Sequence, residues 1–62
     1  MSTQSVAVQF RTIAQMEETF KRMNITNYII SDEDDTMAEA EVTAEQFDEL
    51  CKMEEVVYAS EL

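Results

Sequence analysis

The hydrophobic residues of this chain switch between two periods, and the order of the switches limits the available folds more than any other feature. In residues 6–11 every second residue is apolar, and residues 36–42 alternate in the same way. A period of two is typical of a strand with one buried face. In residues 13–23 the apolar side chains recur at steps of three and four, as in an amphipathic helix. These segments predict two strands and, between them, a helix.

Three further segments complete the pattern. Residues 27–31 are rich in aromatic and β-branched side chains and predict a strand, and the short apolar run 56–59 predicts another. Residues 44–54 carry apolar side chains at helical spacing and predict a second helix. The full order is β-α-β-β-α-β, with the polar residues 32–35 as the turn of a hairpin.

This order predicts an α+β fold in a single domain, residues 1–62. Two right-handed β-α-β crossovers around a central hairpin give a four-stranded antiparallel sheet with both helices on one face, the ferredoxin-like arrangement. A chain of 62 residues is long enough for one domain with a thin core. The second face of the sheet is therefore expected to be open.

The turns and helix ends must form without glycine or proline, because the chain contains neither. Asn24 is the expected helix stop, since asparagine tolerates the left-handed conformation that ends helices. Thr12 with Gln15, and Thr43 with Gln46, have the spacing of capping boxes. The lack of glycine also excludes glycine-rich phosphate-binding loops.

Charge is the strongest functional signal. The chain has 14 acidic and 4 basic side chains and a net charge of −10. Residues 1–31 hold three basic and two acidic side chains, whereas residues 32–62 hold twelve acidic side chains and one basic. Such a field repels nucleic acid and anionic membranes and attracts basic surfaces. The expected partner is a protein or protein complex with a basic surface, with no direct binding to nucleic acid or membrane.

The acidic side chains of the second half are the candidate binding residues. Glu39 and Glu41 are two apart on a predicted strand, so their carboxylates project from one face about 6–7 Å apart. This spacing resembles the regular negative charge of a nucleic-acid backbone. The alternative is that the charge serves only solubility. The full set is Asp32, Glu33, Asp34, Asp35, Glu39, Glu41, Glu45, Asp48 and Glu49.

A cation site in the acidic turn is the alternative interpretation of residues 32–35. A calcium-binding loop that begins at Asp32 needs glycine at its sixth position and glutamate at its twelfth. Those positions are Met37 and Thr43. The pattern fails, so a solvated turn is favoured and no metal site is predicted.

Met37 and Ile29 are expected to lie together on the open face of the sheet. Exposed apolar groups among acids make a contact patch for a partner or for a second copy of the chain.

Catalysis is not predicted. Cys51 is expected to be a small buried residue on the second helix, and the chain has no histidine to activate it. A domain this thin has little room for a pocket of about 300 Å³. No cofactor is predicted. One cysteine, no signal peptide and no membrane-spanning run favour a cytoplasmic protein.

In size, charge and lack of catalytic residues, the whole chain resembles the short acidic inhibitors of bacteriophages and mobile elements, such as anti-CRISPR and anti-restriction proteins that mimic nucleic acid. The resemblance implies inhibition of a defence complex in the cytoplasm of the host cell, by occupation of its basic nucleic-acid groove.

Residues 36–62 are similar to the second half of subtilisin propeptide inhibitors, which have the same element order and a Val-x-Tyr pattern in the last strand, here Val56 to Tyr58. That resemblance implies an inhibitor or folding chaperone of a protease, with the C-terminal tail in the protease cleft. The sequence departs from the family at Ala59 and Ser60, where an apolar residue and glutamate are usual.

Overall fold

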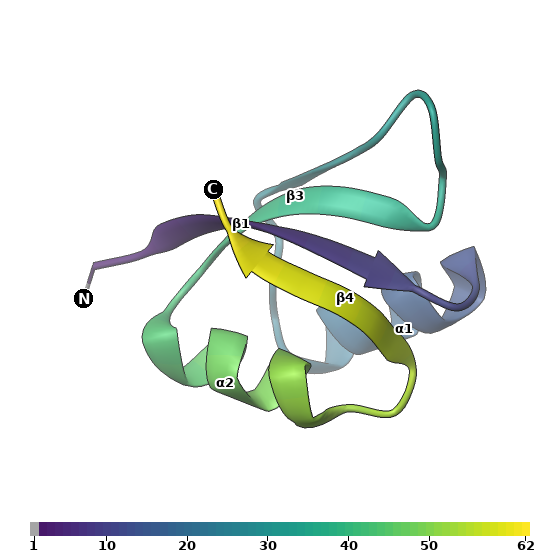
Figure 1. Ribbon diagram of the computed structural model, residues 1–62. Helices are drawn as coiled ribbons and strands as arrows, with labels where there is room; N and C mark the ends of the chain where they lie inside the picture. Colours follow the sequence, from purple (N-terminus) through teal and green to yellow (C-terminus); the bar gives the residue numbers. More distant parts are fainter. Residues whose placement is uncertain (1) are drawn as a thin grey trace.

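The computed structural model describes residues 2–62 and confirms the predicted order of elements (Figure 1). The four strands and two helices are β1 (Gln4–Phe10), α1 (Ile13–Arg22), β2 (Tyr28–Ile30), β3 (Met37–Val42), α2 (Ala44–Lys52) and β4 (Val56–Glu61).

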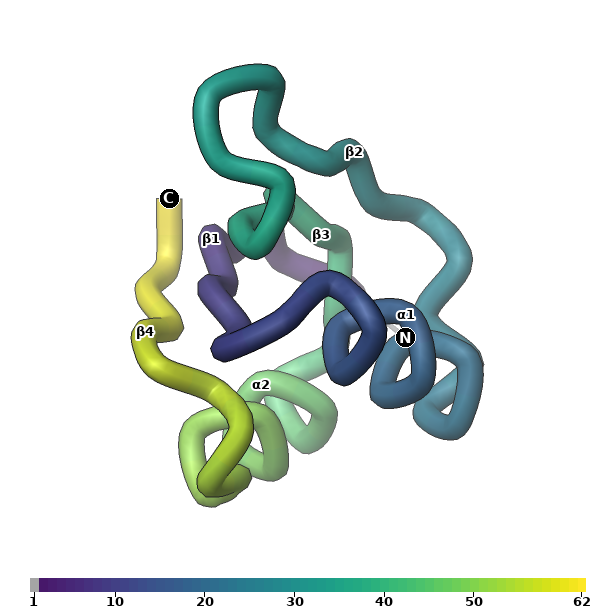
Figure 2. The backbone as a smooth tube through the Cα atoms, turned by 90° about the vertical axis from the view of Figure 1, so that its right-hand side faces the viewer, coloured from purple at the N-terminus to yellow at the C-terminus, as the bar shows by residue number. Residues whose placement is uncertain are grey.

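The sheet has the ferredoxin-like arrangement. Its strand order is β2-β3-β1-β4, and every neighbouring pair is antiparallel. Both helices lie against the same face of the sheet, as Figures 1 and 2 show from two directions. The central strands β1 and β3 are therefore covered on one side, and β2 and β4 form the two edges.

The core lies between the sheet and the helices because the predicted alternation holds. In β1, Val6, Val8 and Phe10 are buried. Helix α1 contributes Phe20, whose ring packs edge-on against Phe10 with centroids 5.5 Å apart. The Phe20 ring also contacts the Tyr28 ring of β2, at a centroid distance of 4.5 Å. The aromatic contacts join helix α1 to one central and one edge strand.

Helix α1 ends at Arg22 with Met23 as its C-cap, and the predicted stop residue, Asn24, follows with a positive φ of 62°. The Asn24 N–H donates to the carbonyl of Lys21, and the Ile25 N–H donates to the carbonyl of Phe20. This pair of bonds is the Schellman motif, in which buried residues at its two ends usually touch. Ile25 and Phe20 both belong to the core.

The two capping boxes have different outcomes. At α2 the box is complete: the Gln46 N–H donates to Thr43 Oγ1, and the Thr43 N–H donates to Gln46 Oε1. At α1 the Gln15 N–H donates to Thr12 Oγ1, but Gln15 Oε1 is buried without a partner. The prediction of a complete capping box at α1 was therefore wrong, because the Gln15 side chain does not accept a hydrogen bond from the Thr12 N–H.

The sheet extends past the sequence prediction at two places. Strand β1 begins at Gln4, opposite Val42, and β4 continues to Glu61, opposite Val6. The added residues pair with well-formed strands, and this pairing outweighs their own weak strand preference.

Candidate binding surface

The face of the sheet that the helices leave uncovered carries the candidate site. Residues that are opposite in register point to the same side of an antiparallel sheet. Ile29 of β2 lies opposite Glu39, which lies opposite Ala7, which lies opposite Ser60. Since Ala38 and Ala40 are buried, their neighbour Glu39 faces away from the core. We call this surface the open face. It consists of Ile29, Met37, Glu39, Glu41, Ser5, Ala7, Gln9, Tyr58 and Ser60.

Exposed apolar side chains flank the small residues in the middle of the open face. Ile29 is 75% exposed on one edge strand, and Tyr58 is 50% exposed on the other. Met37 is half-buried and shares a row with Gln9 and Tyr58. Ile29 and Met37 thus lie where the sequence predicted. The sequence did not predict Tyr58 as a residue of this face, because the face on which its side chain lies depends on the pairing of β4 with β1, which places Tyr58 opposite Gln9.

The carboxylates of Glu39 and Glu41 rise from this apolar surface. Both side chains are exposed. Glu41 accepts a hydrogen bond of 2.8 Å from Asn27 Nδ2, at the start of β2. Among residues 2–62 neither glutamate pairs with a basic side chain. Both negative charges are therefore free to meet a cation from outside.

In the acidic turn, Asp34 has a structural role that the sequence did not reveal. Its Oδ1 accepts from the Thr36 hydroxyl at 2.6 Å and from the Thr36 N–H at 3.0 Å, and its Oδ2 accepts from Gln9 Nε2 at 3.0 Å. The two bonds from Thr36 lower the pKa of the Asp34 carboxyl below its ordinary value. Asp34 thus ties the turn to β1, while Asp32, Glu33 and Asp35 stay exposed.

The acids of α2 do not join this surface. Glu45, Asp48 and Glu49 are exposed on the helix layer, on the opposite side of the sheet from Glu39. Asp48 already forms an ion pair of 2.9 Å with Lys52, and its hydrogen bond raises the pKa of the Lys52 ammonium. The predicted binding set is therefore divided into two groups on opposite faces.

Cys51 was wrongly predicted to be buried; it is exposed. The core position of the second turn of α2 belongs to Leu50, which is fully buried. A helix turns by about 100° per residue, so adjacent positions cannot both point into so thin a core.

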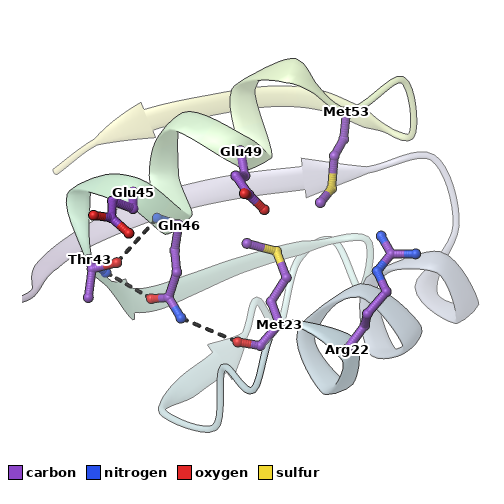
Figure 3. Close-up of a pocket in the computed structure, with 7 residues that line it drawn as sticks. All are labelled: Arg22, Met23, Thr43, Glu45, Gln46, Glu49 and Met53. Atoms are coloured by element: carbon purple, nitrogen blue, oxygen red, sulfur yellow. Dashed lines mark hydrogen bonds between the residues drawn. The ribbon is translucent and has the colours of Figure 1, made fainter.

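A groove of about 520 Å³ lies between the end of α1 and α2, where little room was expected (Figure 3). Met23 and Met53 point into it, Arg22 lies on the α1 side, and Glu45 and Glu49 lie on the α2 side. Gln46 Nε2 donates to the Met23 carbonyl at 3.3 Å and joins the two helices at one end of the groove.

Among residues 2–62, no three His, Cys, Asp or Glu side chains are placed to hold a metal ion.

Comparisons with known proteins found no relative of this chain. No family model, no curated protein and no solved structure matches the chain. In the described part of the chain, neither helix has the length and apolar character needed to cross a membrane. The C-terminal tail, which the propeptide resemblance places in a protease cleft, is held along β1: β4 runs to Glu61, and the Leu62 N–H donates to the Ser5 carbonyl.

Proposed function

We propose that this chain is a non-enzymatic binding protein that docks its open face, together with the acidic turn 32–35, on a basic surface of a partner protein and blocks that surface. One observation carries the proposal: unpaired carboxylates and exposed apolar side chains share the one face of the sheet that the helices leave uncovered.

The arrangement suits a protein interface. In stable interfaces a few exposed apolar anchors supply most of the affinity. Ile29, Met37 and Tyr58 are the anchors, and Glu39 and Glu41 are the charges nearest to them. The exposed acids of the turn extend the negative field and steer a basic partner into place.

The favoured partner is a complex that itself binds nucleic acid. Its basic groove is built for evenly spaced negative charges, and Glu39 and Glu41 offer such charges about 6–7 Å apart. A chain with a net charge of −10 competes for that groove. Phage-encoded inhibitors of host defence complexes in the cytoplasm are the class of protein that this proposal describes.

The test compares equal charge changes on opposite faces. The partner is first isolated by affinity purification from the source cell, and binding kinetics are then measured at two salt concentrations. The double variant Glu39→Lys/Glu41→Lys should slow association strongly, because long-range charge acts mainly on the association rate. The matched control Glu45→Lys/Glu49→Lys makes the same charge change on the helix side and should have a much smaller effect. Circular dichroism confirms that both variants are folded.

Three outcomes would overturn the proposal. Equal losses in the two variants would mean that net charge, or the groove beside α2, governs binding. Binding that survives both high salt and the Glu39/Glu41 reversal would exclude electrostatic docking, since exposed charges are screened over about 8 Å at physiological ionic strength. Failure of the partner's nucleic acid to compete would exclude a nucleic-acid groove as the docking site.

A further inference from the structure

The outer edge of β4 is a row of backbone groups that no strand within residues 2–62 pairs with. Strand order places β4 at one end of the sheet and β2 at the other. Strand β2 has 3 residues, whereas β4 has 6. Natural proteins protect edge strands by shortness, proline, lysine or bulges. Strand β4 has a bulge near Val57 but contains no proline or lysine, so the part after the bulge is left open.

The register determines which β4 groups point outward. The Phe10 N–H donates to the Thr36 carbonyl of the β3 side, so the even residues of β1 bond toward β3 and its odd residues bond toward β4. The bond from the Leu62 N–H to the Ser5 carbonyl fits this alternation.

Because Ala7 pairs with Ser60 and Gln9 with Tyr58, the backbone groups of Tyr58 and Ser60 point inward. The backbone groups of Ala59 and Glu61 point outward. Among these outward groups, the Glu61 carbonyl already accepts a hydrogen bond of 3.2 Å from the Ser60 hydroxyl. Three outward groups are left to bond with an added strand: the Ala59 N–H, the Ala59 carbonyl and the Glu61 N–H.

Exposed apolar surface is concentrated beside this edge. Five large hydrophobic side chains are exposed among the described residues, and three of them are Val57, Tyr58 and Leu62. An incoming strand gains affinity from main-chain hydrogen bonds and from apolar contacts with such side chains. The edge thus offers both parts of a strand-addition site.

We infer that the outer edge of β4 receives an extended segment of the partner as a fifth strand, and that this segment carries lysine or arginine. The charge of the edge selects such a segment: residues 53–62 contain Glu54, Glu55 and Glu61 and no basic side chain. A second copy of this chain is disfavoured, because each copy carries a net charge of −10. The inference rests on the proposed function for the basic character of the partner, but its test is separate.

The first experiment follows amide exchange by nuclear magnetic resonance with a capped synthetic peptide of alternating lysine and valine as the probe. At saturating peptide the amides of Ala59 and Glu61 should exchange at least about tenfold more slowly. The amides of Tyr58 and Ser60, which bond to β1, should change little. Two control peptides should give no protection: one with alternate amides N-methylated, and one with glutamate in place of lysine.

Three results of this experiment would overturn the inference. The first is protection confined to residues outside β4, and the second is equal protection by the N-methylated peptide. The third is a dimer of the free protein in which the Ala59 amide is already protected, because a second copy would then be the occupant.

The second experiment uses the isolated partner and a chain made by chemical synthesis. N-methylation of the Ala59 amide should weaken binding at least about tenfold. N-methylation of the Tyr28 amide, which points outward from β2 by the same alternation, is the matched control and should change binding little. Equal effects would overturn the inference. If N-methylation at Ala59 has no effect while Glu39→Lys/Glu41→Lys still weakens binding, the edge inference fails and the proposed function stands.

Discussion

Truncation of Phe20 to alanine is expected to remove a large part of the stability of the fold. The Phe20 side chain is 1% exposed and touches both Phe10 and Tyr28. Its removal costs about 3–5 kcal/mol, which includes the cavity that remains. A folded chain of this length is stable by only about 3–9 kcal/mol, from about 0.05–0.15 kcal/mol per residue. The cost therefore ranges from about a third of the stability to all of it.

The milder variant Phe20→Leu gives a measurable shift. It keeps most of the buried volume but loses two aromatic contacts, so its cost is about 1–2 kcal/mol. With a urea dependence of about 1 kcal/mol per molar, the unfolding midpoint should fall by roughly 1–2 M. Urea unfolding followed by far-ultraviolet circular dichroism measures both the midpoint and the slope.

The matched control is Ile29→Ala, which removes a large apolar side chain that is 75% exposed. Its effect on stability should stay within about 0.5 kcal/mol, while its effect on partner binding should be large. If Phe20→Ala were as stable as the unmodified chain, or if Ile29→Ala were the more destabilising of the two, the assignment of the core to the helix side of the sheet would be refuted.

Two further predictions concern the caps and the acids. Thr43→Ala should cost about 1–2 kcal/mol and Thr12→Ala less, because the box at Thr43 is complete and the one at Thr12 is not; urea unfolding that ranks them in the reverse order would contradict this. Stability should not fall between about pH 7 and about pH 5, because the two groups whose pKa is shifted, Asp34 and Lys52, lose their contributions only outside this range. The pKa of Asp34 is lowered in the folded state, so its contribution is present above its unfolded pKa and is lost only as the pH falls below roughly 4. The pKa of Lys52 is raised, so its contribution is lost only in the alkaline range. Thermal unfolding across these pH values is the measurement, and a steady loss of stability from pH 7 to 5 would show that paired carboxylates dominate.

The sequence alone determined the local structure. Periods of two and 3.6 residues located β1, β3 and the two helices, because they report which side chains face a core before any partner is known. Aromatic and β-branched content located β2, and a short apolar run located β4. Asn24 marked the end of α1, since its left-handed conformation depends only on the residue and its neighbours. The capping box at Thr43 was predicted for the same reason, since both its bonds span three residues, although the same spacing at Thr12 gave only one of the two bonds.

The tertiary structure decided which acidic residues lie together. Glu39 and Glu45 are six positions apart in the sequence, yet they lie on opposite sides of the sheet, because a strand and the helix that follows it belong to different layers. The amino-acid composition gives the total charge but does not indicate on which layer of the fold each charge lies. Asp34 illustrates the same limit: its bond to Gln9 joins residues 25 positions apart. The side on which Tyr58 lies, and the outward amide of Ala59, depend on the pairing of β4 with β1 and on the bulge between them, and such long-range pairing is fixed only when the strands meet in the folded chain.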